Sequence, residues 1–283
     1  MKKNKKWLFL IVAGVLLLIW MAWGNTALEL NEYSIQSKNL PDAFDGFRIV
    51  QISDLHNAEI GKQNETIIKM TEEAKPDIIV LTGDLVDSRR TDVKIAIEFV
   101  KQVVEIAPCY YVTGNHESAI SEEAYAELEQ GLIQAGVMVL HNEMISIERG
   151  EQSISLAGVD DPWFTDVYDR GKHTLSSERI KGLFSEEGFQ ILLSHRPELF
   201  QVYVNANVDL VFSGHAHGGQ FRFPFVGGVY APHQGIFPEY DAGLFSKDET
   251  NMLVSRGIGN SIFPLRINNR PEVVVVELRS KIQ

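Results

Sequence analysis

The sequence predicts an α/β domain that follows one N-terminal apolar helix. Three observations support this fold class. Residues 7–23 carry no charged side chain. A unit of apolar strand, polar tip and helix occurs three times between residues 47 and 135. Later apolar strands again end at polar residues, which is the arrangement that open α/β sheets use to build ligand sites.

The amino terminus is typical of a membrane anchor. Residues 1–6 read MKKNKK, and we interpret them as a basic cytoplasmic end. A helix over residues 7–23 reaches roughly 26 Å, close to a hydrocarbon core of about 30 Å. Trp7, Trp20 and Trp23 suit the boundary between lipid and water. No lysine or arginine follows until Lys38, so a single-pass cell-membrane protein with an extracytoplasmic domain is expected.

A cleaved signal peptide is the alternative, because it has the same basic start and apolar middle. Only Ala22-Trp23-Gly24 resembles a cleavage site, and a bulky tryptophan lies between its small residues. Cleavage would give a secreted protein, and the domain would again lie outside the cytoplasm.

Residues 24–46 are polar, contain Pro41 and Gly46, and are interpreted as a tether to a domain over residues 47–283. The first half of that domain alternates strands with amphipathic helices. The expected strands are 47–53, 77–81 and 109–113, and the expected helices are 62–74, 92–106 and 121–135.

From Val137 onward short strands dominate the pattern. They are expected at 137–140, 144–149, 153–159, 190–193, 208–212, 253–255 and 273–278. The sequence of residues 45–283 contains no repeat, no low-complexity stretch and no proline-rich linker, so one domain is the simplest interpretation.

Composition excludes several classes of function. Apolar residues make up 45% and charged residues 23% of the 283 positions, as in ordinary folded proteins. Cys109 is the only cysteine, which excludes an internal disulfide and a cysteine-rich zinc site. Four of the 26 basic residues lie in the first six positions, which leaves 22 basic against 38 acidic residues and a net charge of −16. Binding of a nucleic-acid polymer is therefore not expected.

Polar residues follow five of the expected strands, and their types match a metal centre. Carboxylate and amide oxygens with imidazole nitrogens are ligands for Mn, Fe, Zn, Ni or Co. Five of the eight histidines of the chain belong to these tips, where random placement would scatter them. The tips are Asp54-Leu55-His56, Gly83-Asp84, Gly114-Asn115-His116-Glu117, Ser194-His195 and Gly214-His215-Ala216-His217.

This ordered set resembles the calcineurin-like metallophosphoesterase superfamily over roughly residues 45–280. Three longer motifs, Gly158–Pro162, His217–Gln220 and Ser255–Ser261, resemble its bacterial membrane-associated branch, which includes phosphodiesterases and enzymes similar to UDP-2,3-diacylglucosamine pyrophosphatase. The resemblance implies two mixed β-sheets packed face to face, flanked by helices, with the site at the strand ends. It also implies two divalent metal ions per chain, with Mn expected first.

The resemblance assigns roles to individual residues. Asp54, His56 and His217 would hold the first metal, Asp84 would bridge both, and Asn115, His195 and His215 would hold the second. His116 would lie beside the leaving oxygen as the catalytic acid. Two dications acidify a bridging water, so a hydroxide would attack a phosphodiester or pyrophosphate.

Substrate-binding candidates are residues that lie near the motifs in sequence. Local positive charge is needed in an acidic body, so Arg196, Arg222, Arg256 and Arg266 are considered. For each one taken singly, a solvated side chain or a structural ion pair is the more common role. Asp160 and Asp161 either line the cleft or cap the turn before Pro162.

Two further questions stay open at this point. The aromatic loop around His233 (Phe221, Phe223, Phe225, Tyr230, Phe237 and Tyr240) either packs over the core or forms an apolar rim that meets lipid or a sugar. The alternative to an enzyme is a metal-binding scaffold without turnover in the cell envelope. His116 favours the enzyme, because a scaffold needs the ligands but not the acid.

Overall fold

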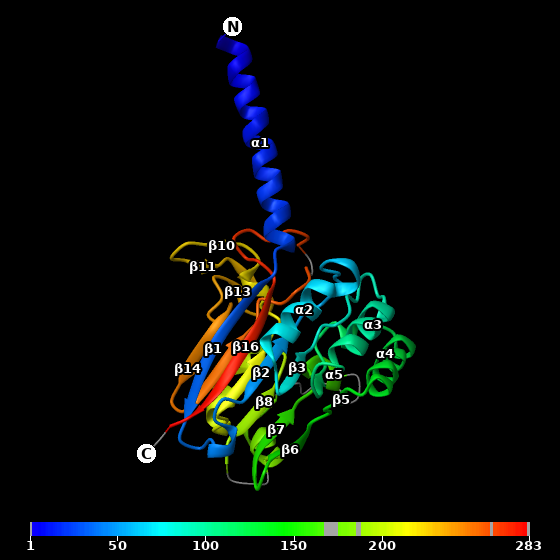
Figure 1. The fold of residues 1–283 in the computed structure, drawn as a ribbon, viewed down its shortest axis with the longest axis vertical. Coiled ribbons are helices and arrows are strands. Elements are labelled where there is room, and N and C mark those ends of the chain that lie inside the picture. Colours follow the sequence, from blue (N-terminus) through cyan, green and yellow to red (C-terminus); the bar gives the residue numbers. More distant parts are fainter. Residues whose placement is uncertain (1, 167–174, 185–187, 261–262, 282–283) are drawn as a thin grey trace.

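The computed structural model describes residues 2–166, 175–184, 188–260 and 263–281. Helix α1 (Lys2–Thr26) projects away from the domain as a separate rod (Figure 1). Among the described residues it is the one helix long and apolar enough to cross a membrane, by length and composition. Ser261, the last residue of the Ser255–Ser261 motif, lies outside the described residues.

Two six-stranded mixed sheets form the centre of the domain, which confirms the predicted fold class. The first sheet has the order β1-β16-β2-β3-β4-β5, and β2 to β5 are parallel. Its strands are β1 (Glu29–Ser37), β16 (Glu272–Ser280), β2 (Arg48–Ile52), β3 (Ile78–Thr82), β4 (Cys109–Val112) and β5 (Met138–Val139).

The second sheet has the order β14-β15-β9-β8-β7-β6, with β15, β9, β8 and β7 parallel and an antiparallel strand at each edge. Its strands are β14 (Gly243–Lys247), β15 (Thr250–Val254), β9 (Leu210–Ser213), β8 (Gln190–Leu193), β7 (Gln152–Gly158) and β6 (Glu143–Arg149).

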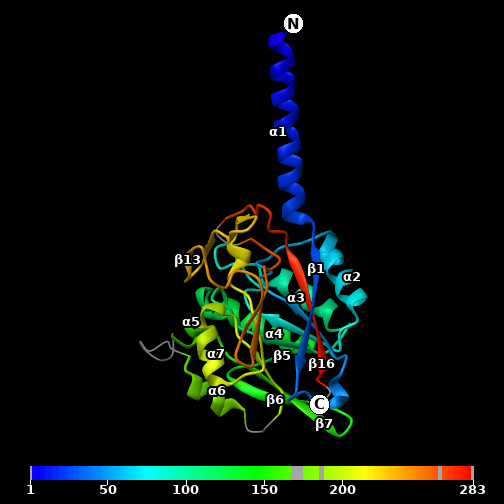
Figure 2. The ribbon, with the colours of Figure 1, turned by 90° about the vertical axis from the view of Figure 1, so that its left-hand side faces the viewer.

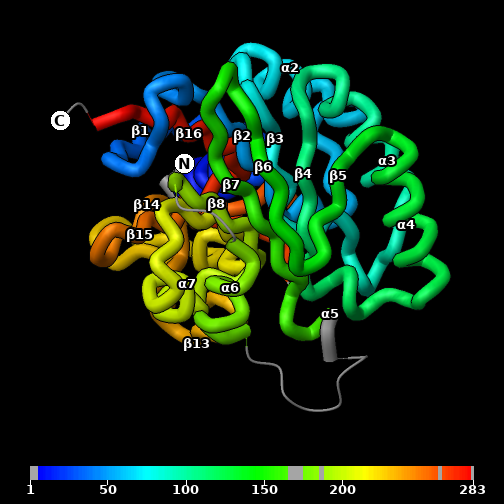
Figure 3. The backbone as a smooth tube through the Cα atoms, turned by 90° about the horizontal axis from the view of Figure 1, so that it is seen from below, coloured from blue at the N-terminus to red at the C-terminus, as the bar shows by residue number. Residues whose placement is uncertain are grey.

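Helices cover the outer face of each sheet, so the layers run helix, sheet, sheet, helix (Figure 3). Helices α2 (Glu65–Ala74), α3 (Val93–Val103) and α4 (Glu122–Ala135) pack on the first sheet. Helices α6 (Ser177–Leu183) and α7 (Phe200–Ala206) pack on the second sheet, and the short α5 (Pro162–Asp166) follows β7.

Alternation along each strand divides its side chains between these layers. In β2, Ile49 faces the core between the sheets, and its neighbour Val50 faces the helices. Leu156 and Phe212 enter the same central core from the second sheet. Both faces of the central strands are buried, which explains the continuous apolar runs in the sequence.

The expected tether differs from the structure. Residues Glu29–Ser37, inside the 24–46 segment, form the edge strand β1, which pairs in parallel with β16. Within this strand only Ile35 is buried, and the other side chains alternate between half-buried and exposed positions. A strand with so few buried positions has a sequence that resembles a polar loop. The sheet therefore begins at Glu29 rather than near residue 47.

Short hairpins lie at the end of the domain from which α1 leaves (Figures 1 and 2). They are β10 (Arg222–Phe223) with β11 (Gly227–Gly228), and β12 (Tyr230–Ala231) with β13 (Gly235–Ile236).

Candidate metal centre

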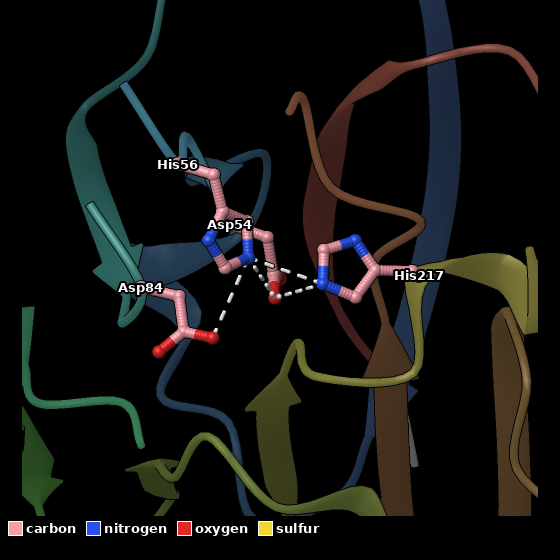
Figure 4. Close-up of side chains that lie close together, drawn as sticks. All are labelled: Asp54, His56, Asp84 and His217. Atoms are coloured by element: carbon pink, nitrogen blue, oxygen red, sulfur yellow. Dashed lines mark hydrogen bonds and ion pairs between the residues drawn. The ribbon is translucent and has the colours of Figure 1, made fainter. Parts of the chain in front are cut away.

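Loops after β2, β3, β4, β8 and β9 bring the predicted polar tips together at one edge of the two sheets. The parallel strands of each sheet point their carboxyl ends the same way, so their following loops meet. Figure 4 shows four of these side chains pointing toward one another: Asp54, His56, Asp84 and His217.

These four buried residues form the first cluster, with their ligand atoms all within 4.8 Å of one another. The Nε2 atoms of His56 and His217 are 3.1 Å apart. Oδ1 of Asp54 lies 3.4 Å from His217 Nε2, and Oδ2 of Asp84 lies 3.5 Å from His56 Nε2. Two imidazole nitrogens and two carboxylates facing one point suit a divalent cation.

The second cluster shares Asp84 with the first. Oδ2 of Asp84 lies 3.2 Å from His195 Nε2, which is in turn 3.2 Å from His215 Nδ1. One carboxylate oxygen thus faces histidines of both clusters, as a ligand that bridges two metals requires. Oδ1 of Asn115 is buried and has no hydrogen-bond partner among the described residues, which fits a fourth ligand beside Asp84, His195 and His215.

The backbone at these tips is unusual. Five of the candidate ligands have left-handed φ angles between 46° and 66°, in a region that costs energy for residues other than glycine. They are Asp54, His56, Asp84, His215 and His217. Their clustering at one site indicates that the surrounding structure holds them there for function.

Close packing explains two glycines of the motifs. A Cβ on Gly114 would lie 2.2 Å from Oδ1 of Asp84, and a Cβ on Gly214 would lie 2.3 Å from Oδ2 of Asp54. Only glycine leaves room for the carboxylates at these positions. Gly114 and Gly214 are therefore part of the metal centre.

Charge in the cluster favours a cation. Burial raises the pKa of Asp54, but His217 and His56 outweigh burial and hold that pKa at about 2. Burial lowers the pKa of His217 to about 3, so this imidazole is neutral and can coordinate. Burial alone would lower the pKa of His195, but Asp84 outweighs it and raises that pKa to about 10. A dication would replace the proton that His195 holds.

His116 lies over the first cluster but is not one of the four residues whose ligand atoms face one another there. Its ring centroid is 4.4 Å from that of His56, in an edge-to-face arrangement. Its Nδ1 accepts a hydrogen bond from the backbone N–H of Ser88 at 3.0 Å, and Oδ1 of Asp87 lies 3.8 Å away. Asp84 accepts the backbone N–H of His116 at 2.8 Å.

Glu117 has a role that sequence analysis did not assign. Its buried carboxylate accepts the backbone N–H groups of Gly114, Asp84 and Leu85 at 2.7 to 2.9 Å. It thereby ties the loop of the bridging aspartate to the loop of Asn115. Its position directly after His116 in the motif was the available signal.

Arg196 lies beside the second cluster, and its role in substrate binding stays a prediction. It is buried, pairs with Asp161 and lies 5.1 Å from the Trp163 ring. Its Nη1 lies 3.1 Å from His215 Nε2 and 2.7 Å from His233 Nδ1.

His233 also contacts the second cluster, and sequence analysis left it in the aromatic loop. Its ring stacks on His215, and its Nδ1 lies 2.8 Å from His215 Nε2. A metal on Nδ1 of His215 would leave the proton on Nε2, facing that acceptor. Partners of this kind orient a metal-binding histidine.

The other arginine candidates are held by structural contacts. Arg222 pairs with Asp241 at 2.9 Å, and Arg256 pairs with Glu272 at 2.9 Å. Arg266 is fully buried, and its guanidinium donates to backbone carbonyls. Among the described residues, these three guanidinium groups make no hydrogen bond to a candidate metal ligand. A substrate role for Arg222 or Arg256 therefore stays a prediction.

Asp160 lies in a polar network rather than in an open cleft. Its Oδ1 accepts from Thr113 at 3.0 Å and lies 2.8 Å from His141 Nδ1, and its Oδ2 accepts from Asn142 at 2.7 Å. Thr113 directly precedes Gly114, so Asp160 supports the Asn115 loop from behind. Its proposed contact with substrate stays a prediction.

One pocket, of about 430 Å³, reaches the metal centre through His56. Arg90, Asp92, Asn260 and Pro264 also line it. Arg90, on its wall, pairs with Asp87 at 3.0 Å.

Comparison with known proteins agrees with this geometry. The model of the calcineurin-like phosphoesterase family matches residues 47–219. The chain is 31% identical to the uncharacterized metallophosphoesterase YkuE of Bacillus subtilis over 260 residues, covering 89% of this chain and 86% of the relative. It is 30% identical to phosphodiesterase YaeI of Escherichia coli, covering 82% of each.

A solved structure shares the fold. The sulfate thiohydrolase SoxB of Thermus thermophilus superposes with a TM-score of 0.51 at 12% identity, over 85% of this chain and 57% of that one. The match of the family model over residues 47–219, more than half of the chain, and the 31% identity to YkuE over 89% of it show that the chain belongs to the calcineurin-like phosphoesterase family.

Proposed function

We propose that the protein is a binuclear-metal-dependent hydrolase that cleaves a phosphodiester or pyrophosphate bond. The observation that carries this proposal is the position of Asp84 Oδ2 between His56 of the first cluster and His195 of the second. Two dications, when bound, supply a nucleophile from water and neutralise charge on the phosphate. Asp54, His56 and His217 would hold one metal, and Asn115, His195 and His215 the other.

His116 is proposed to donate a proton to the leaving oxygen. Its Nδ1 is occupied as an acceptor by Ser88, so the proton of the neutral ring lies on Nε2. The exposed fraction of His116 is only 9%, which shields that donor from water. Arg196 is proposed to bind a phosphate oxygen, since its Nη1 lies beside His215 of the second cluster.

The pocket beside His56 suggests that the substrate is larger than phosphate itself. A diester or pyrophosphate carries groups on both sides of the reacting phosphorus, and a volume of about 430 Å³ accommodates one of them. The similarity to a protein named as a phosphodiesterase favours the diester. A lipid-linked, nucleotide-linked or other envelope phosphate would satisfy this chemistry.

Helix α1 is proposed to remain attached as a membrane anchor, with the catalytic domain outside the cytoplasm. Its last residues pack on the domain: Arg270 lies 4.6 Å from the Trp23 ring, and Arg266 N–H donates to Asn25 Oδ1 at 2.7 Å.

A substrate panel tests the proposed reaction. Full-length protein loaded with Mn should hydrolyse bis-aryl phosphodiesters or pyrophosphates faster than aryl phosphomonoesters. Equal inactivity on all three classes, in protein shown to contain metal, would favour the scaffold.

Topology is tested separately. A reporter fused after Gln283 should be active only outside the cytoplasm, and the protein should sediment with membranes. A soluble product that begins near Asn25 would support cleavage, and a cytoplasmic reporter would contradict both forms of the proposal.

A further inference from the structure

Exposed apolar side chains gather at the end of the domain from which α1 leaves. We call this surface the apolar cap and define it by Phe223, Phe225, Val226, Ile236, Phe237 and Phe263, all exposed. Phe225 is fully exposed, at the tip of the β10–β11 hairpin. Figure 1 shows β10, β11 and β13 beside the base of α1. Contiguous apolar surface of this kind marks a contact with another apolar phase.

Contacts between α1 and the domain join the cap to the end of the helix. Asn25 accepts the Arg266 N–H at 2.7 Å and donates to the Arg266 carbonyl at 3.2 Å. Arg266 is only three residues from Phe263, whose ring lies 5.8 Å from that of Phe221, next to the hairpin. The apolar cap is therefore continuous with the point at which the chain emerges from α1.

Charge is nearly absent from the cap. Between His217 and Glu239 the only Asp, Glu, Lys or Arg is Arg222, and its guanidinium pairs with Asp241. The rest of the chain after residue 6 is strongly acidic, so this gap in charge is local. Aromatic and aliphatic side chains without nearby charges suit the headgroup–acyl boundary of a bilayer.

We propose that the apolar cap inserts into the interface of the same bilayer that α1 crosses. This rests on the proposal above that α1 is kept as a span. The lipid surface is the one occupant that lies next to the cap whenever α1 is in a membrane. The pocket beside His56 includes Asn260, whose Nδ2 lies 3.3 Å from Asn25 Oδ1, so docking brings the metal centre close to the lipid headgroups.

Site-directed fluorescence on the full-length chain tests the cap. Cys109 is buried, and burial raises the pKa of its thiol to about 12, so an introduced surface cysteine reacts selectively. Phe225→Cys, Leu17→Cys in α1 and Ile133→Cys on α4 are each labelled with an environment-sensitive dye. Ile133 is the matched control, since it is exposed and apolar but outside the cap. Each protein is reconstituted into vesicles of phosphatidylcholine and phosphatidylglycerol, with or without brominated acyl chains.

The proposal expects a blue shift and loss of emission by bromine at Phe225 and Leu17, but not at Ile133. Side chains ~5–10 Å into the headgroup–acyl boundary are within reach of the bromines. Quenching at Leu17 without quenching at Phe225, as at Ile133, would overturn the proposed insertion of the cap while leaving the span intact. No quenching at Leu17 would overturn the span itself. A blue shift at Phe225 without quenching would show that protein, such as a second copy, covers the cap, and would also overturn the proposal.

Discussion

The backbone N–H of Ser88 donates a hydrogen bond of 3.0 Å to Nδ1 of His116. A ring nitrogen that accepts a hydrogen bond carries no proton, so the neutral imidazole keeps its proton on Nε2. The position of Ser88 thus selects the tautomer that donates. This contact distinguishes His116 from the neighbouring histidines that face the candidate metal positions.

Changing His116 to Gln should separate chemistry from metal binding. We expect metal content near that of the wild type and a fall in kcat of about 10²–10⁴-fold, as for loss of a general acid. The defect should shrink for a nitrophenolate leaving group, because that oxygen needs little protonation. Metal analysis and kinetics on two leaving groups check this.

His215→Ala is the comparison, because its ring nitrogen lies in the second cluster. It should lose metal as well as rate, with no dependence on the leaving group. If His116→Gln empties a metal position, its assignment as a proton donor is wrong.

Asp84→Asn should weaken both metal positions at once. Its Oδ2 faces His56 and His195, and an amide loses the negative charge that holds two dications together. Metal content and kcat should both fall, by elemental analysis and assay. The control variant Asp248→Asn removes the same negative charge from the β14–β15 turn and should change neither metal content nor kcat. Full occupancy in Asp84→Asn would argue against a bridging role.

Stability should decline at alkaline pH because of His141. The hydrogen bond that His141 donates to Asp160 raises the pKa of His141 to about 9, with Glu129 adding to the effect. This folded-state pKa exceeds the ordinary value near 6.5, so the contribution is fully present below about pH 6.5 and is lost as pH rises through about 9. Denaturant unfolding between these pH values should show a loss in the wild type that His141→Gln does not share. Parallel pH profiles for the two proteins would refute the assignment.

Arg196→Met should destabilise the fold. Arg196 and Asp161 are both buried, and removing one partner leaves the other charge unpaired. The expected loss in free energy of unfolding is about 3–5 kcal/mol. Lys101→Met, which breaks the exposed pair with Glu98, should change it by only about 0.5 kcal/mol. Similar midpoints of denaturation for the two variants would contradict a buried structural pair.

Local patterns were enough to find the centre of the candidate site. Asp54, Asp84 and His215 each follow an apolar run, and the rules of parallel sheets bring such positions together. The packing of two mixed sheets could not be predicted from local patterns, because it depends on contacts between distant strands that no local period encodes. That prediction rested on the family resemblance.

Residues that support the site were harder to predict. Strand β1 has few buried side chains, because it lies at a sheet edge, and its sequence resembles a loop. The contact of His233 with His215 joins positions 18 residues apart through an irregular loop. Glu117 acts through backbone N–H groups, which leave no trace in residue type.

Dependence of hydrolysis on metal content tests the central claim most directly. Full-length protein is stripped with chelator, titrated with Mn, and assayed on a bis-aryl phosphodiester while bound metal is measured. The two clusters around Asp84 predict that activity disappears in chelator and returns as occupancy approaches two ions per chain. Full activity in excess chelator, with no bound metal, would contradict it.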